Sequence, residues 1–338
     1  MERWSCEAIN QWWQKQRWPV GINYVTSDAV NDIEMWMDST FNAPRIEKEL
    51  KLAVDIHLNS VRVFLSYAVW YNERERFLSN FDTFLNLADK AGLTVMPVLF
   101  DDCAFDFASE PVYGPQPDPV PGVHNSRWVP SPGFIVQDDP TQESSCEEYV
   151  RAIIGAHRED QRILVWDLYN EAGNTNRQEK ALPLLQKVFS WARDCRPVQP
   201  LTACLWQFTA DSAADDYCLA MSDVISIHTY RPIKETLEIL ASIEKQDRPI
   251  LVTEWLHRPA DNTMEEHLPL FFERKIGAWQ WGMIRGKTQT NLNWSTMNGG
   301  TPEPEPTLWQ HDLLYPDGTP YRPEEVALIA ELTGKSDA

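Results

Sequence analysis

The sequence predicts an α/β protein built as a (β/α)8 barrel, the TIM-barrel architecture, in a single domain over residues 1–338. Eight short apolar or β-branched runs each precede a stretch with helical spacing. Composition does not break along the chain, and the 338 residues fall within the roughly 200–400 typical of such barrels. An open doubly wound sheet is the alternative, but Gly21-Ile22-Asn23-Tyr24 does not resemble its GxGxxG fingerprint.

The expected elements alternate strictly. Strands are predicted over 20–25, 60–67, 93–100, 163–169, 201–206, 224–230, 250–255 and 277–284. Helices are predicted over 44–58, 73–91, 147–157, 178–194, 211–220, 234–245, 264–275 and 323–332. The strand runs are apolar on both faces, as expected where helices cover a parallel sheet.

The spacing of apolar residues and the residues at the helix ends support the predicted helices. In 73–91, Phe77, Phe81 and Phe84 recur at helical spacing, and Gly92 stands where a C-terminal cap is expected. In 44–58, Ile46 and Leu50 share one face with later apolar residues. The stretch 101–145 is rich in proline and glycine, and it is predicted to be a long loop after the third strand.

Net charge and composition indicate which classes of binding partner to expect. The formal net charge of −20 disfavours nucleic acid and anionic membrane surfaces, so neither is expected as a partner. A neutral sugar is not repelled, and 15 tryptophans offer flat faces for pyranose rings. A carbohydrate is therefore the expected partner.

Six cysteines without a CxxC pattern indicate mostly buried or free thiols in a reducing compartment. The first residues lack a charged-then-apolar signal region, and no apolar run reaches 18 residues. These features predict a cytoplasmic protein. A secretion signal trimmed before this sequence begins remains the alternative.

The ends of the predicted strands carry polar and aromatic residues, where a barrel places its chemistry. Burial of such groups is costly unless they line a site. The strand ends hold Asn23-Tyr24, Arg62, Asp101-Asp102, Asn170-Glu171, Trp206-Gln207, His228-Thr229-Tyr230, Thr253-Glu254-Trp255 and Trp279-Gln280-Trp281.

Two of these residues, Glu171 and Glu254, predict a retaining glycosidase. That reaction needs one carboxyl group to protonate the leaving oxygen and a second to attack the anomeric carbon, about 5–5.5 Å apart. We expect Glu171 to be the acid/base, with its pKa raised by the negative charge of Glu254. For either glutamate alone, a salt-bridged strand-end residue is the alternative.

Asn170-Glu171 after the fourth strand and Glu254 after the seventh resemble the clan of retaining barrel glycosidases (clan A), and in particular its cellulase- and mannanase-like family 5. The resemblance extends over nearly the whole chain. It implies hydrolysis of O-glycosyl bonds in β-linked saccharides, with Glu171 as acid/base and Glu254 as nucleophile. It also implies that Asn170 binds the sugar 2-hydroxyl and that Arg62 holds the nucleophile ionised.

The same resemblance suggests further substrate-binding residues. His228 and Tyr230 match a His-x-Tyr motif whose phenol hydrogen-bonds the nucleophile, although His228 could equally be a core residue. Trp281 matches the tryptophan that floors the sugar, with packing as its alternative. Trp206 is expected either on the leaving-group side or in the core.

The third strand departs from the family pattern, because Asp101-Asp102 stands where many members place a histidine. Asp101 could bind sugar hydroxyls, and either aspartate could cap the following turn, which we favour for Asp102. Trp36, Trp70 and Trp128 lie in predicted strand-to-helix loops and could form subsite walls, although packing is favoured for each.

Other functional classes fit less well. Glu254 and His257 have ExxH spacing, but a second copy and HExxH are absent, so no metal or other cofactor is expected. No GxSxG indicates a serine hydrolase. A barrel that binds carbohydrate without catalysis is the remaining alternative. If the loop 101–145 closes one end of the cleft, the enzyme would favour short oligosaccharides and exo-action.

Overall fold

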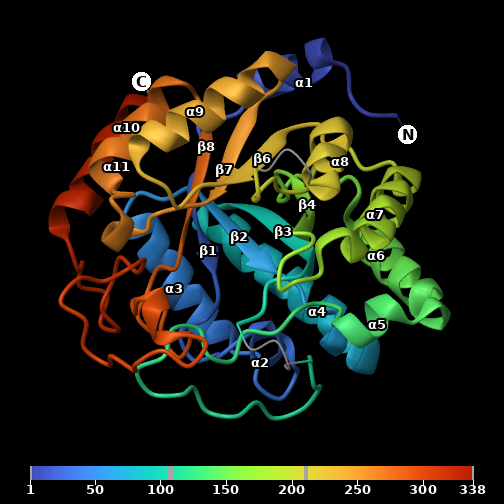
Figure 1. Ribbon diagram of the computed structural model, residues 1–338, viewed down its shortest axis with the longest axis horizontal. Coiled ribbons are helices and arrows are strands. Elements are labelled where there is room, and N and C mark those ends of the chain that lie inside the picture. The colour runs from blue at the N-terminus through green and yellow to red at the C-terminus, as the bar shows by residue number, and fades with distance from the viewer. Residues whose placement is uncertain (1, 106–109, 209–211, 337–338) are drawn as a thin grey trace.

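The computed structural model of the chain describes residues 2–105, 110–208 and 212–336. Eight parallel strands form one sheet in the order β5-β4-β3-β2-β1-β8-β7-β6, and a parallel bridge between Leu205 and Ile227 closes it into a barrel (Figure 1). The predicted (β/α)8 barrel is therefore confirmed. The strands are β1 (Val20–Tyr24), β2 (Ser60–Phe64), β3 (Thr94–Asp101), β4 (Trp166–Asn170), β5 (Leu201–Thr202), β6 (Ile225–His228), β7 (Ile250–Glu254) and β8 (Gly277–Trp281).

Helices surround this barrel, and most lie where periodicity predicted them. They are α1 (Cys6–Gln14), α2 (Asp32–Trp36), α3 (Ala43–Asp55), α4 (Tyr67–Ala91), α5 (Phe134–Asp138), α6 (Glu143–His157), α7 (Leu182–Cys195), α8 (Ala213–Met221), α9 (Ile233–Ile243), α10 (Met264–Glu273) and α11 (Pro323–Ser336). Helix α4 starts earlier than the predicted residue 73, because a turn preceding a kink at Glu73 (φ −141°) is joined to it. Residue 211, where one helix was predicted to begin, and residues 106–109 of the predicted loop lie outside the described residues.

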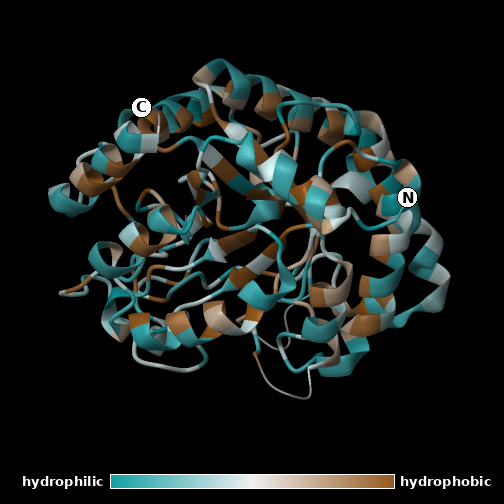
Figure 2. Cartoon of the chain, turned by 90° about the horizontal axis from the view of Figure 1, so that it is seen from above, coloured by the Kyte–Doolittle hydropathy of each residue, from teal (hydrophilic) through white to brown (hydrophobic). Residues whose placement is uncertain are grey.

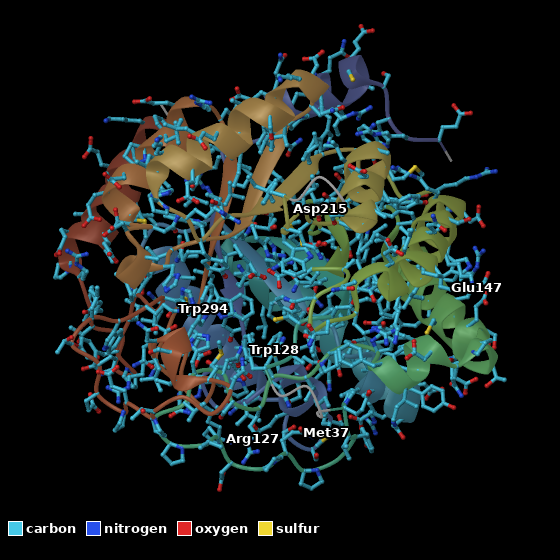
Figure 3. All side chains as sticks on the ribbon, in the orientation of Figure 1. Met37, Arg127, Trp128, Glu147, Asp215 and Trp294 are labelled. Carbon is cyan, nitrogen blue, oxygen red and sulfur yellow. The ribbon has the colours of Figure 1, made fainter. Side chains whose placement is uncertain are left out.

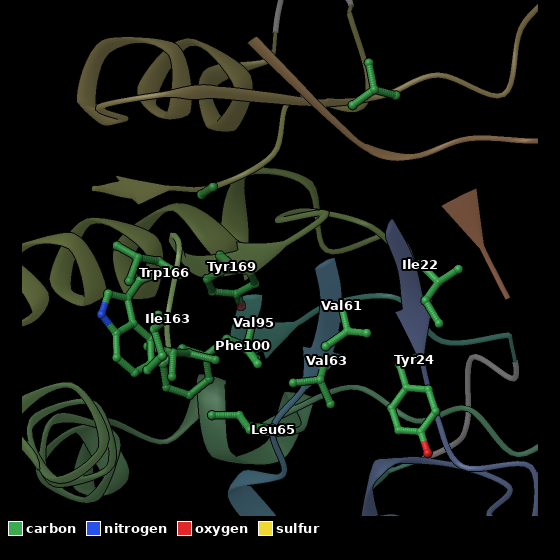
Figure 4. Packing of buried hydrophobic residues seen from close by; sticks show 14 of the residues in the cluster. Ile22, Tyr24, Val61, Val63, Leu65, Val95, Phe100, Ile163, Trp166 and Tyr169 are labelled. Carbon is green, nitrogen blue, oxygen red and sulfur yellow. The ribbon is translucent and has the colours of Figure 1, made fainter. Parts of the chain in front are cut away.

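Successive side chains of the strands point alternately outward to the helices and inward to the barrel interior. On β2, Val61 and Val63 point outward into the layer between barrel and helices (Figure 4). Arg62, between them, points into the barrel and is fully buried. On β1, Ile22 points outward in the same way and Asn23 points inward, where it accepts a hydrogen bond from Arg62. The expectation of apolar residues on both faces is thus wrong for the inner face of these strands. The polar inner residues belong to the site described below.

The N-terminal end of the barrel is closed by α1, an element the sequence analysis missed. Ile9 and Trp13 of this helix pack on Leu251 and Trp279 inside the barrel. Trp279 fits there because residue 21 is glycine: a Cβ atom at Gly21 would lie 2.6 Å from the indole and 2.2 Å from a backbone oxygen. The apolar plug leaves the opposite end for the site.

Two long segments extend from the other end of the barrel, one after β3 and one after β8. The segment after β3 runs to α5 at Phe134, so the loop predicted over 101–145 is shorter than expected: α5, a 3-10 helix (Pro140–Gln142) and the start of α6 lie within it. The segment after β8 runs to α11 with only a short 3-10 helix, Trp294–Thr296, inside it. In Figure 1 the teal segment and the orange segment meet along the lower edge of the view. Figure 2 shows apolar and polar residues alternating along the surrounding helices. Within the described residues, no helix combines the length and apolarity needed to cross a membrane.

Candidate active site

Arg62 is the centre of a buried hydrogen-bond network at the C-terminal end of the barrel. Its guanidinium donates to Glu254 Oε1 at 2.8 Å, to Asp167 Oδ2 at 2.9 Å, to Asn23 Oδ1 at 2.6 Å and to Asn170 Oδ1 at 2.6 Å. Although burial alone would lower the pKa of Arg62, Asp167 and Glu254 raise it. The guanidinium therefore stays charged and fixes two strand-end side chains, Asn170 and Glu254.

Glu254, at the end of β7, is held from both sides. Its Oε1 accepts from Arg62, and its Oε2 accepts from the Tyr230 hydroxyl at 2.9 Å. The register between β6 and β7 shifts between Ile227 and His228, which brings His228 opposite Glu254. Such a bulge re-aims side chains next to a site. The predicted contact between the phenol of Tyr230 and Glu254 is present.

Glu171 follows β4 directly and has φ +45°, a conformation that non-glycine residues rarely adopt. Its Oε1 lies 2.7 Å from His228 Nδ1, and its Oε2 accepts from Asn174 Nδ2 at 2.5 Å. One ligand atom from each of Glu171, His228 and Glu254 lies within 4.8 Å of the others. Two glutamates 83 residues apart in the sequence thus meet across one site.

Burial raises the pKa of both carboxyl groups. The pKa of Glu171 rises to about 7, because loss of solvent outweighs the hydrogen bond from Asn174 and the charge of Arg62. Burial, and to a lesser extent the charge of Glu171, raises the pKa of Glu254, while His228, Arg62 and Tyr230 act in the opposite direction. The expectation that the charge of Glu254 raises the pKa of Glu171 is therefore corrected: burial is the cause. Glu254 also has a direct guanidinium bond, which favours its charged form and which Glu171 lacks.

His228 lies between the two carboxyl groups and is neutral, since burial lowers its pKa to about 4. Its Nδ1 is 2.7 Å from Glu171 and 3.4 Å from Glu254, and its Nε2 is without a partner among the described residues. With both glutamates ionised, the single imidazole proton is best placed on Nδ1. His228 belongs to the site and is not an isolated core histidine.

These groups open into a pocket of about 850 Å³. Asn170, Glu171, His228, Tyr230 and Glu254 all line it. The predicted Trp281 lines it as well and is 8% exposed, packed edge-on against Phe64 and Trp128. Trp206 lines the pocket on the β5 side, half-buried, with its indole donating to the carbonyl oxygen of Ala172.

The two aspartates at the end of β3 have structural partners that differ from those expected. Asp101 accepts from the backbone N–H of Cys103, and also from Asn170 and Trp128 at 2.8 Å each. It is 2% exposed and is not among the described residues that line the pocket. Asp102 instead accepts from the backbone N–H of Gly173, in the loop after β4. The expectation that Asp102 caps the following turn is wrong, and Asp101 positions Asn170.

Several residues of the site were not singled out by sequence reasoning. Asn174 and Cys103 flank Glu171, Asp167 pairs with Arg62, and Trp294 lines the pocket from the β8 segment. Asn174 lies three residues after Glu171, a proximity that the sequence does show, whereas the long β8 segment gave no signal. Of the three loop tryptophans, Trp128 lines the pocket.

Trp36 and Trp70, the other two loop tryptophans, are fully buried and serve packing, as favoured.

Glu171, His228 and Glu254 form the one group of at least three His, Cys, Asp or Glu residues that could hold a metal ion among the described residues. Both oxygens of Glu254 already accept from fixed donors, and the guanidinium of Arg62 lies 2.8 Å away. A cation there would be repelled by a permanent positive charge. The arrangement fits proton transfer and nucleophilic attack better than metal binding.

Comparison with known proteins shows the fold clearly. No family model matches this sequence, and no curated protein matches it. A GH5_18 protein from Streptomyces cattleya, solved in complex with Manβ1-4GlcNAc, is 15% identical with a TM-score of 0.65, covering 93% of this chain and 80% of that chain. The exo-β-1,4-mannosidase of Opitutaceae bacterium strain TAV5 is 16% identical with a TM-score of 0.64, covering 95% of this chain and 60% of that chain. The endo-β-1,4-mannanase of Thermotoga petrophila is 13% identical with a TM-score of 0.58, covering 96% and 78%.

At these identities the likeness is one of fold, and it confirms the resemblance in architecture expected from the sequence.

Proposed function

We propose that this protein is a retaining glycoside hydrolase that cleaves β-glycosidic bonds by double displacement. One observation carries the proposal: Glu171 and Glu254 bring carboxylate oxygens within 4.8 Å of each other in a pocket. This separation fits the retaining spacing of about 5–5.5 Å and not the roughly 6.5–9.5 Å of inverting enzymes, which must admit a water.

The different surroundings of the two glutamates support their separate roles. With a pKa of about 7, Glu171 is partly protonated near neutral pH and can donate a proton to the leaving oxygen. Glu254, held by Arg62 and Tyr230, attacks the anomeric carbon and forms a glycosyl-enzyme. Glu171 then removes a proton from water, which releases the sugar.

The neighbouring side chains would bind the sugar. Both ends of the Asn170 amide are engaged, yet Nδ2 carries a second hydrogen that can reach the sugar 2-hydroxyl from the pocket. Trp281 would form the floor beneath the ring, and Trp206 would contact the leaving group. His228 would steady both carboxyl groups, while Arg62 and Asp101 would act through the residues they hold.

A panel of aryl β-glycosides tests the proposal, beginning with β-mannosides because three neighbours carry β-1,4-mannoside chemistry in their names or ligands. Glucosides, galactosides and xylosides complete it. Glu254→Ala should abolish turnover. Glu171→Ala should lose activity mainly on poor leaving groups, since a good leaving group needs no protonation.

Glu49→Gln is the matched control, because Glu49 is a buried carboxyl on α3 whose partners are Tyr24 and Ser27 outside the pocket. It should retain turnover. Sugar binding without hydrolysis of any glycoside by the wild-type protein would instead favour a carbohydrate-binding barrel.

A further inference from the structure

We infer that the protein removes single sugars from the non-reducing end of its substrate. This inference rests on the proposed function, because it uses the roles of Glu171 and Glu254 to orient the substrate. Two observations carry it: the pocket is walled on the side of Glu254, and it continues into a second cavity on the side of Glu171. Neighbours of similar fold are named both exo- and endo-acting, so the fold alone does not decide.

The wall is built where the segments after β3 and β8 dock on each other. The backbone N–H of His124 donates to Thr296 Oγ1 at 2.9 Å, and its Nδ1 lies 2.7 Å from the carbonyl oxygen of Leu292. The Gln289 amide donates to the carbonyl oxygens of Val120 and Val123 at 2.8 and 3.0 Å. These hydrogen bonds hold the segment after β3 and the segment after β8 together as one unit.

Two tryptophans of this wall, Trp294 and Trp128, contact residues that hold the side chains of the active site. The Trp294 ring packs against Tyr230, the donor to Glu254, with centroids 4.8 Å apart. On the other side, Trp128 donates to Asp101, which in turn binds Asn170. Both tryptophans are labelled near the middle of Figure 3, beside the strand ends.

The opposite side of the pocket is continuous with further space. A second cavity of about 500 Å³ shares Asn176, Gln178 and Gln207 with the main pocket. Its lining includes the charged residues Arg177, Glu179 and Lys180. Such a surface suits the hydroxyl-rich remainder of a saccharide.

The direction of the substrate follows from the chemistry. The nucleophile bonds the anomeric carbon of the sugar on the glycone side, and the acid protonates the oxygen of the leaving saccharide. Glu254 is linked through Tyr230 to the Trp294 wall, whereas the loop that follows Glu171 runs to Asn176 and Gln178 at the second cavity. The terminal sugar therefore occupies the closed end, and the rest of the chain extends past Trp206.

Paired substrates test this inference: 4-nitrophenyl β-mannoside with 4-nitrophenyl β-mannobioside, and the β-glucoside with the β-cellobioside. For the sugar that the protein accepts, the monosaccharide glycoside should release nitrophenol at once. The disaccharide glycoside should first release a monosaccharide, and nitrophenol should follow after a lag. Immediate nitrophenol together with intact disaccharide would overturn the inference while leaving the proposed function standing. Hydrolysis of no glycoside would refute both.

Trp294→Ala should open the wall and lower the preference for single-sugar release by roughly tenfold. Trp12→Ala is the matched control, since Trp12 is also a half-buried tryptophan but packs at the closed bottom of the barrel. It should keep the wild-type products. Unchanged products from a folded, active Trp294→Ala variant would overturn the assignment of the wall to Trp294.

Discussion

Replacing Arg62 by methionine removes a buried positive charge and leaves two buried carboxyl groups, Asp167 and Glu254, without their partner. Arg62 and Asp167 are both 0% exposed as side chains, and Glu254 is 8% exposed. Breaking a buried ion pair in this way costs about 3–5 kcal/mol of folding free energy. Without the guanidinium, the pKa of Glu254 should rise further, because burial is then opposed only by His228 and Tyr230.

Urea unfolding and the pH dependence of kcat/KM measure the two effects separately. Activity should fall on the order of 100-fold, because both Glu254 and Asn170 lose their positioning donor. The acidic limb of the profile should move to higher pH, since Glu254 must be ionised to attack. The double variant Arg62→Met/Asp167→Asn should recover part of the stability and none of the activity.

Arg258→Met is the matched control, because Arg258 forms a buried ion pair with Glu325 in which both side chains are 1% exposed. It should destabilise the protein by a similar amount and leave the pH profile unchanged. If Arg62→Met lost stability but kept the wild-type profile, or if Arg258→Met moved the acidic limb as well, our reasoning on Arg62 would be wrong.

Three further predictions concern the same carboxyl groups. The alkaline limb of kcat/KM should lie near pH 7, the pKa of Glu171, and Asn174→Ala should move it to higher pH by removing a hydrogen bond that favours the charged form. Tyr230→Phe should move the acidic limb of the kcat/KM profile to higher pH and slow turnover roughly 10- to 100-fold, the effect of one hydrogen bond to a charged group. An unchanged pH profile would show that the Tyr230 hydroxyl does not stabilise ionised Glu254. Because the pKa of Glu171 is raised from 4.5 to about 7 on folding, its contribution to stability is fully present below pH 4.5 and is lost as pH rises through 7. This loss is about 3 kcal/mol. The free energy of unfolding of the wild-type protein should therefore fall between pH 5 and pH 8 by about this amount more than that of Glu171→Gln.

The sequence predicted the fold because each strand and helix carried its own local signal. It also predicted both glutamates, since Asn170-Glu171 and Glu254 follow apolar strands and strand ends converge in a barrel. The partners of Asp101 and Asp102 were not predictable, because they depend on which backbone N–H reaches each carboxylate.

Two other features exceeded what a single sequence contains. The raised pKa of Glu171 arises from burial, and burial is set by the packed structure around it. The wall at Trp294 depends on the docking of two loops that are far apart in the sequence. Asn125 and Thr288, which share a backbone hydrogen bond between these loops, are 163 residues apart. Loop docking of that kind leaves no periodic pattern in the residues themselves.

The configuration of the first-formed sugar tests the central claim most directly. Proton NMR on a β-glycoside that the protein hydrolyses, recorded before mutarotation, should show the β-anomer, because two successive displacements at one carbon restore its configuration. Initial appearance of the α-anomer would mean a single displacement by water, and Glu254 could not then be the nucleophile.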